Sequence, residues 1–294
     1  MADDELEDDL LYHYCSVEAL YAILDSGHLR VTNIRYMNDS KEISWLFEIA
    51  KQALGDRRYG VKSDDESKLY KLLLGHCNNL YLDESFFPNV FCACFSRIKD
   101  SLSQWRAYAS DGQGVAIGFS RDYLTSFVSE WRTRLAPVQY KRMSAADEFH
   151  DDIKAAQSEV KLKGRQLLGD EISIIANGVE TKWDLRAPFY KNAAFHEEDE
   201  VRLVHIGNVN EQWSFKTPIG PIRFYPRNSV IVPYIALPLD PSRNPIIKIV
   251  LGPRNRVEHT QWGISEFARS KGFTFARDQF EISSASYGEV RRTR

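Results

Sequence analysis

The sequence predicts a mixed α+β fold whose sheets are mostly antiparallel and are interrupted by helical insertions. Strand-like apolar runs gather near the start, the middle and the end of the chain, whereas helical periodicity dominates at about 40–80 and 144–180. Strand and crossover helix therefore do not alternate regularly, as they would in a doubly wound parallel fold. We expect a single domain over 1–294, with helical insertions at these two stretches.

The first expected element is a strand at the start of the stretch Leu11–Ser16, which leads directly into a helix ending at Gly27. Ser16 suits the N-cap of this helix, and Gly27 suits its left-handed end. A side chain that leaves a strand just before a helix N-terminus lies beside unpaired backbone donors, where polar or anionic ligands are commonly held. His13 is therefore the first candidate site residue, and a buried, hydrogen-bonded structural histidine is the alternative.

The next elements follow from periodicity and capping signals. A short strand is expected at 29–32, and Asn38–Asp39 is placed to cap a helix, although it could form part of a pocket instead. Helical spacing predicts helices over 40–54 and 65–80, joined by a surface loop. The apolar run Val90–Ser96 predicts a strand that is covered on both faces and lies centrally in the sheet.

The remaining elements complete the α+β pattern. They are one or two helical turns over 100–108, a turn at Gly112–Gly114, a strand at 115–119, a helix from Ser120 to about Trp131, a charged helical stretch at 144–180, an acidic segment at 195–205 that ends as a strand, strands at 230–235, 246–251 and 280–283, and a helix at 257–271.

Composition narrows the class of protein. A net charge of −3 gives no broad basic field for nucleic acid, although the tail Arg291–Arg294 is locally basic. The acidic start and the absence of a long apolar run predict a cytoplasmic protein with no membrane segment. The cysteines are scattered through apolar segments, which predicts that they are buried, reduced thiols. The histidines are dispersed along the sequence, which predicts that the protein has no metal site. The cysteines are Cys15, Cys77, Cys92 and Cys94.

An acidic segment carries the second candidate site. If 198–202 is extended, Glu198, Glu200 and Arg202 share one face of a strand. Two neighbouring carboxylates beside an arginine suit hydrogen bonding to sugar hydroxyls and can oppose a developing positive charge. Glycosyl transfer passes through such an oxocarbenium-like state. The alternative is an exposed acidic strand edge that Arg202 merely neutralises.

Taken together in their order, these features resemble the bacterial family known as domain of unknown function 2971. The resemblance extends from about residue 10 to the Ile246–Pro253 stretch. It is carried by His13 ahead of Gly27, Asn38–Asp39, the Phe91–Ser96 run, Trp105 with Tyr108, Gly114–Phe119, and Glu198-x-Glu200-x-Arg202.

A more distant resemblance is to ADP-ribosyltransferases, whose first strand ends in a histidine and whose late strand carries a Glu-x-Glu pair. This resemblance implies an ADP-ribosyltransferase-like fold, with NAD as substrate and no metal. It also implies that His13 binds a ribose hydroxyl, that Glu200 stabilises the oxocarbenium ion, and that Glu198 orients the acceptor. The other residues that it places at the NAD site are Tyr14, Cys15, Ser96, Trp105, Tyr108 and Arg202.

The expected function is ADP-ribosyl transfer or NAD hydrolysis in a bacterial toxin, stress or defence system. The acceptor, protein or nucleic acid, and the oligomeric state are left open. The sequence departs from the resemblance in lacking a clear counterpart of the middle tyrosine of the His-Tyr-Glu type. Two alternatives remain: a non-catalytic nucleotide or nucleic-acid binding sensor, and a purely structural protein in which Trp105 and Tyr108 are core aromatics. Dinucleotide, phosphate-loop and nucleophile-elbow motifs are absent from the sequence, and a Cys15–His13 nucleophile is disfavoured.

Overall fold

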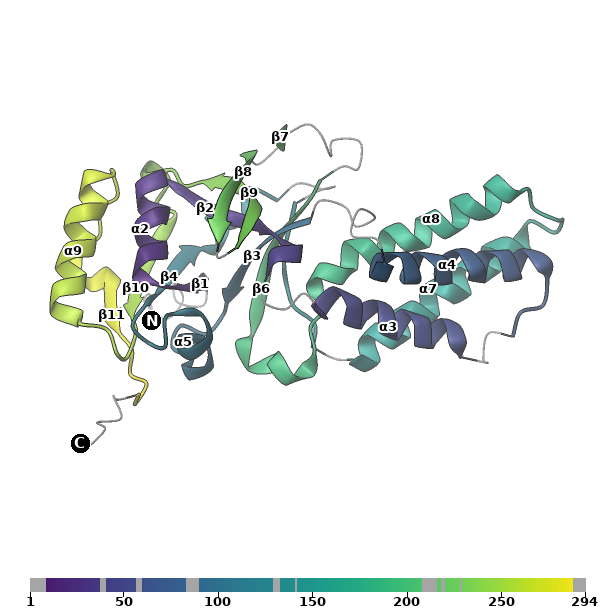
Figure 1. Ribbon diagram of the computed structural model, residues 1–294, viewed down its shortest axis with the longest axis horizontal. Helices are drawn as coiled ribbons and strands as arrows, with labels where there is room; N and C mark the ends of the chain where they lie inside the picture. Colours follow the sequence, from purple (N-terminus) through teal and green to yellow (C-terminus); the bar gives the residue numbers. More distant parts are fainter. Residues whose placement is uncertain are drawn as a thin grey trace. The chain divides into compact units, whose positions relative to one another are not determined.

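The computed structural model describes residues 9–37, 41–56, 60–82, 90–128, 133–140, 142–207, 216–217, 220–227 and 229–287 (Figure 1). The chain divides into two compact units. The first unit contains Met1–Asn33, Phe91–Pro137 and Glu197–Arg294, and the second contains Ile34–Val90 and Val138–His196. The two expected helical insertions fall in the second unit, and the single-domain organisation stays a prediction.

A mostly antiparallel sheet forms the first unit, which confirms the mixed α+β class. Its strands are β1 (Leu10–Cys15), β2 (His28–Asn33), β3 (Val90–Ser96), β4 (Val115–Ser120), β5 (Thr133–Pro137), β6 (Glu200–Ile206), β7 (Lys216–Thr217), β8 (Gly220–Arg227), β9 (Val230–Pro238), β10 (Ile246–Leu251) and β11 (Phe280–Ile282). They follow the order β11-β10-β4-β1-β3-β2-β9-β8-β7, and β6 joins β5 to β3. The ladders of β1 with β3 and β4, and of β9 with β2 and β8, are antiparallel, whereas β10 and β11 run parallel.

Strand β3 is the branching point of this sheet. It pairs with β1 at Tyr12↔Ser96, with β2 at Thr32↔Cys92, and also with β6. A strand has only two edges for backbone hydrogen bonds, so two of these three partners must share one edge. All residues of β3 except Cys94 are buried, as expected for an apolar strand that is covered on both faces.

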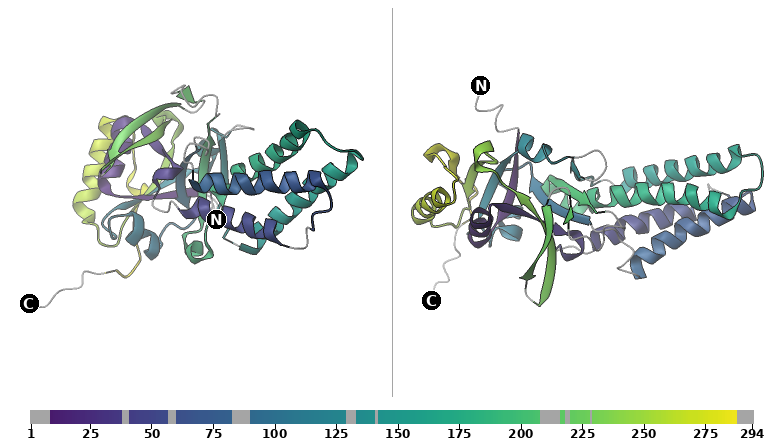
Figure 2. Two further views of the ribbon diagram at one scale, coloured as in Figure 1. Left: turned by 45° about the vertical axis from the view of Figure 1, so that its right-hand side comes forward. Right: turned by 90° about the horizontal axis from the view of Figure 1, so that it is seen from above.

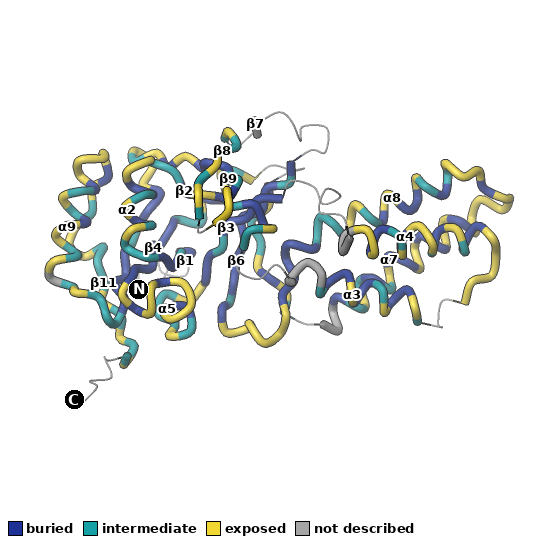
Figure 3. The backbone as a smooth tube through the Cα atoms, in the orientation of Figure 1, coloured by how far each residue is buried: buried dark blue, intermediate teal, exposed yellow. Residues whose placement is uncertain are grey.

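The two faces of the sheet carry different helices. Helices α2 (Val17–Ser26) and α9 (Val257–Ser270) cover the larger core, in which Leu11 and Phe95 are buried. The short helix α5 (Leu102–Tyr108) covers the opposite face, where Trp105 packs with Tyr12. Side chains alternate along a strand, so the parity of a residue number within β1 or β3 decides which face it meets. Figure 3 shows that strands β1, β3, β4 and β6 are largely buried, whereas β8 is exposed or partly exposed along its length.

The second unit is a bundle of four long helices within the described segments, α3 (Lys41–Gly55), α4 (Asp64–Leu82), α7 (Arg142–Leu162) and α8 (Gly169–Arg186). These helices run side by side in all views (Figure 2). Each packs mainly against two neighbours, in the cyclic order α3-α4-α8-α7. Phe47, Leu73, Phe149 and Trp183 are among the buried core side chains. Of the described helices, none is long and apolar enough to cross a membrane.

Short helical segments complete the described structure. They are α6 (Arg121–Thr125) and the 3-10 segments η1 (Ile34–Tyr36), η4 (Ala187–Phe189), η5 (Ala193–Glu198), η7 (Pro241–Arg243) and η8 (Arg277–Gln279).

Several local expectations need correction. The helix that begins after Ser120 ends at Thr125 instead of about Trp131, because the amides of Phe127 and Val128 bond three residues back and form turns. The stretch 144–180 is two helices, since Gly164 adopts a left-handed φ of 62° just beyond the end of α7. Strands β5 and β8 were not expected, and β8 contains Pro221 and Pro226, which weaken a strand signal. The Asn38–Asp39 cap and the basic tail lie outside the described residues.

Gly114, just before β4, lies close against the backbone at the end of β1. A Cβ atom added there would lie 2.2 Å from the Cys15 carbonyl oxygen and 2.9 Å from that of Ala109, both backbone atoms. We expect Gly114→Ala to lower the free energy of unfolding by about 3 kcal/mol. Gly263→Ala in helix α9 is the matched control, because its Cβ meets nothing within 4 Å. This substitution should raise the free energy of unfolding by about 0.5–1 kcal/mol. Urea unfolding of both variants measures this, and equal stabilities would contradict the close approach.

Candidate active site

The acidic residues lie where a 3-10 segment meets strand β6. Glu198 ends η5 and Glu200 begins β6, so the expected extended run over 198–202 is correct only from Glu200 onward. Asp199 separates them with a φ of 41°, in the left-handed region. The backbone turns here because Asp199 is paired with Arg97 through its side chain, and its carbonyl accepts from the Arg97 amide at 3.1 Å.

Glu200 and Arg202 form a buried ion pair on one face of β6. Arg202 donates from Nε to one carboxylate oxygen of Glu200 at 2.8 Å and from a terminal nitrogen to the other at 2.9 Å. Only 5% of Glu200 and 1% of Arg202 is exposed. Burial lowers the pKa of Arg202, but the charge and hydrogen bond of Glu200, together with the neighbouring Cys94 and Cys92, outweigh this and raise the pKa well above its ordinary value. The pair is therefore buried, unlike the exposed strand edge that was the alternative.

Glu198 is held from two directions. Tyr108 at the end of α5 donates its hydroxyl to a carboxylate oxygen of Glu198 at 3.1 Å. The Ser96 hydroxyl at the end of β3 donates to the Glu198 carbonyl at 2.7 Å and accepts from the Ile98 amide at 3.0 Å. Glu198 is buried, and Tyr108 is 36% exposed. The structure thus brings together three of the expected site residues on the α5 side of the sheet.

Two cysteines complete this site and were not expected in it. Cys92 and Cys94 project from the same face of β3, with their sulfur atoms 3.7 Å apart. Their hydrogen bond, burial and the nearby Glu200 carboxylate raise the pKa of the Cys94 thiol. Both cysteines are free thiols, as expected. Their alternating positions in the Val90–Ser96 run are the signal that could have placed them beside one another.

His13 lies on a different face from the acidic pair. By strand alternation it shares the α2 side of β1 with Leu11 and Cys15, whereas Glu200 and Arg202 share the α5 side. Its ring meets Phe95 edge-on at 5.9 Å, and Nδ1 donates to the Cys94 carbonyl at 2.9 Å. This bond fixes the Nδ1–H tautomer, since a carbonyl can only accept. The structure therefore does not bring His13 and the acidic pair onto one surface.

The other expected NAD-contacting residues have structural partners. The Tyr14 hydroxyl donates to the Ile98 carbonyl and accepts from the Ser101 amide, and its ring meets Trp105 edge-on at 4.7 Å. Trp105 is fully buried and donates its indole N–H to Asp100 at 2.6 Å. Cys15 is buried in the larger core, where burial raises its pKa to about 12. These side chains pack between sheet and helix, in line with core roles.

The described residues contain no group of three or more His, Cys, Asp or Glu side chains arranged to hold a metal ion. The chemistry available at the site is that of carboxylates, thiols and hydroxyls. Both oxygens of the Glu200 carboxylate accept from Arg202, and one oxygen of Glu198 accepts from Tyr108. The site can therefore orient a hydroxyl-bearing ligand and oppose positive charge in a medium of low dielectric constant.

The fold and this acidic centre define the first unit as an antiparallel α+β domain with a buried carboxylate site. Residues 104–203 match a family described as a protein of unknown function, DUF2971. The match confirms the resemblance to this family that the sequence suggested. The matched segment contains Trp105, Tyr108, Glu198 and Glu200, whereas His13 lies outside it. No curated protein and no solved structure matches the chain.

The Glu200–Arg202 pair predicts a large coupling energy. Glu200→Leu or Arg202→Met alone leaves one buried charge unpaired and should lower the free energy of unfolding by about 3–5 kcal/mol. The double variant removes both charges and should lie within about 1 kcal/mol of the wild type. Urea denaturation of the four proteins gives the coupling energy as a double-mutant cycle. Additive effects of the two single changes would contradict the buried pair.

His13 predicts a pH dependence of stability. Burial lowers its pKa below the ordinary value, while the bond to Cys94 raises it by less. The unfolded chain therefore binds the imidazole proton more tightly than the folded chain does. The contribution of His13 to the free energy of unfolding is complete above about pH 6.5, and it is lost as the pH falls toward the pKa of the folded state. His13→Asn keeps an amide nitrogen near the position of Nδ1 and cannot titrate. Between pH 7 and 5, the wild type should lose stability more steeply than this variant in urea unfolding. Parallel profiles would contradict a neutral His13 ring in the folded protein.

Proposed function

We propose that the protein cleaves the N-glycosidic bond of NAD at the acidic site of β6, and transfers ADP-ribose to a macromolecule or to water. The observation that carries the proposal is the pair of oriented carboxylates at one end of β3. Glu198 is held by Tyr108, and Glu200 by Arg202. Two carboxylates with different partners suit two different roles, one beside the developing charge and one beside the acceptor.

In this proposal the bond from C1′ of the nicotinamide ribose to the ring nitrogen breaks, and its electron pair leaves with nicotinamide. Glu200 stands beside the resulting oxocarbenium ion, whose charge it stabilises. The acceptor hydroxyl or water then bonds to C1′ and gives up its proton, for which Glu198 is the nearest candidate base. No metal takes part in this scheme.

We also propose that the first unit is ADP-ribosyltransferase-like in fold. The support is its antiparallel sheet, its opening strand-to-helix unit with a histidine on β1, and an acidic pair at the start of a late strand. The opposite-face position of His13 limits its role in this proposal to orienting the β1–β3 junction through the Cys94 carbonyl. A cytoplasmic role in a bacterial toxin, stress or defence system belongs to the same proposal.

A second candidate is the non-catalytic nucleotide or nucleic-acid binding module. One observation favours it: strands β2, β8 and β9 contain no acidic residue. The guanidinium of Arg30 on β2 lies 4.4 Å from the ring centre of Tyr225 on β8 and 5.4 Å from that of Tyr234 on β9. Arginine and tyrosine planes of this kind can stack with bases. In this case NAD or an oligonucleotide binds saturably without release of nicotinamide.

Nicotinamide release from labelled NAD tests the first proposal. Glu198→Gln keeps an oxygen that accepts from Tyr108 but removes the charge, so the fold should persist while release slows about 100-fold. The double variant Glu200→Leu/Arg202→Met should also be inactive with near-normal stability. Glu266→Gln is the matched control, because this exposed carboxylate on α9 pairs only with Arg269 among the described residues.

Two outcomes would overturn NAD cleavage at this site. One is the absence of nicotinamide release by the wild type with either water or a cell-extract acceptor. The other is an unchanged rate in Glu198→Gln and in the double variant. Saturable binding of NAD without release would instead support the binding module.

A further inference from the structure

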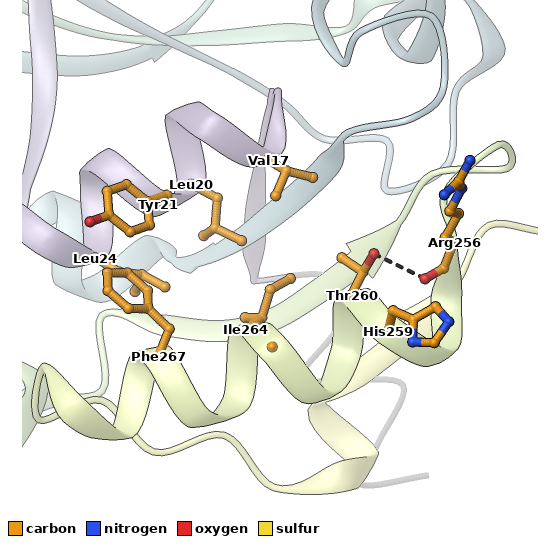
Figure 4. Close-up of a pocket in the computed structure, with 10 residues that line it drawn as sticks. Val17, Leu20, Tyr21, Leu24, Arg256, His259, Thr260, Ile264 and Phe267 are labelled. Atoms are coloured by element: carbon orange, nitrogen blue, oxygen red, sulfur yellow. Dashed lines mark hydrogen bonds between the residues drawn. The ribbon is translucent and has the colours of Figure 1, made fainter.

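A groove of about 480 Å³ lies between helices α2 and α9 of the first unit, on the opposite side of the sheet from the acidic site (Figure 4). Its walls are largely apolar. Helix α2 contributes Val17, Leu20 and Leu24, and helix α9 contributes Ile264 and Phe267. A pocket of 300–1,000 Å³ with apolar walls is the usual size and character of a small-molecule site.

One position of α9 at the groove carries no side chain. Gly263 lines it, and a Cβ atom added there would meet nothing within 4 Å. Two helices that pack closely normally interdigitate their side chains at such a position. Here the space opposite Leu20 and Leu24 is left unfilled by the protein itself.

One end of the groove is closed by aromatic and ionic contacts between the two helices. The rings of Tyr21 and Phe267 stack with their centres 4.4 Å apart. Beyond them, Lys271 pairs with Asp25 at 2.7 Å. These contacts hold the C-terminal parts of the helices together and leave the groove open toward their N-terminal ends.

The open end is polar and positively charged. Arg256 and His259 stand there, beside Thr260, whose hydroxyl donates to the Arg256 carbonyl at 3.0 Å (Figure 4). Among the described residues, the Arg256 guanidinium has no hydrogen-bond or ion-pair partner. None of the described side chains that line the groove is acidic, and Glu18 in the first turn of α2 is not part of the lining.

We propose that this groove binds an amphipathic carboxylate, an acyl chain that ends in one anionic group. The chain would lie along Leu20, Leu24 and Ile264, and the carboxylate would meet Arg256 at the open end. Burial of apolar carbon supplies most of the affinity, and the exposed guanidinium selects the anionic head. This site is independent of the acidic centre on β6.

Calorimetric titration with decanoate and with decanol tests the inference. We expect decanoate to bind the full-length protein saturably, and decanol to bind more weakly. Gly263→Leu fills the groove from a position with room for a side chain, and should weaken decanoate at least tenfold. Gly178→Leu in α8 is the matched control, because its Cβ also meets nothing within 4 Å, and it should bind decanoate as the wild type does.

Arg256→Gln separates the two halves of the site. Loss of this exposed charge should weaken decanoate about threefold to fivefold and leave decanol unchanged. Three results would overturn the inference: no saturable binding of decanoate, equal affinity for decanol in the wild type, or full decanoate affinity in Gly263→Leu. Thermal melting of each variant checks that it is folded.

Discussion

The branching of the sheet at β3 is the constraint on which the first unit depends. A strand can offer backbone donors and acceptors along two edges only, yet β3 serves β1, β2 and β6. The β1–β3 ladder is a single residue pair at Tyr12↔Ser96. Where that ladder stops, the His13 ring donates a hydrogen bond to the Cys94 carbonyl. A side chain therefore completes the hydrogen bonding at the junction of three strands.

The same junction explains why the acidic residues are buried. Because β6 lies against a central strand, its first residues enter the interior and not a solvent-facing edge. A carboxylate there needs a partner, and Arg202 provides it from two residues further along the strand. Removing either side chain alone would leave a buried charge unpaired and lower the free energy of unfolding. The same two side chains therefore determine both the stability of this region and the electrostatics of the candidate site. Any ligand at this site meets an electrostatic field that is already organised.

Much of the fold followed from local signals in the sequence. Ser16 caps α2, Gly27 ends it with a φ of 63°, and the apolar Val90–Ser96 run is the central strand. These features depend on neighbouring residues, so a single sequence can indicate them. The candidate site was predicted in part: Glu198, Ser96 and Tyr108 meet, and Glu200 meets Arg202. Cys92 and Cys94 joined them without being expected, because which strand neighbours β6 depends on contacts between distant segments.

The sequence by itself determined the α+β class, the order of most helices and strands, and the helical character of the two insertions, since each follows from periodicity, capping and turn residues over short distances. Only the tertiary structure decided which faces those elements share. The side of the sheet that His13 meets depends on the parity of its position in β1 and on where β1 pairs with β3, and a shift of one residue would reverse it. The groove beside Gly263 is likewise a product of helix packing, because the absence of a side chain creates a space only when another helix lies opposite.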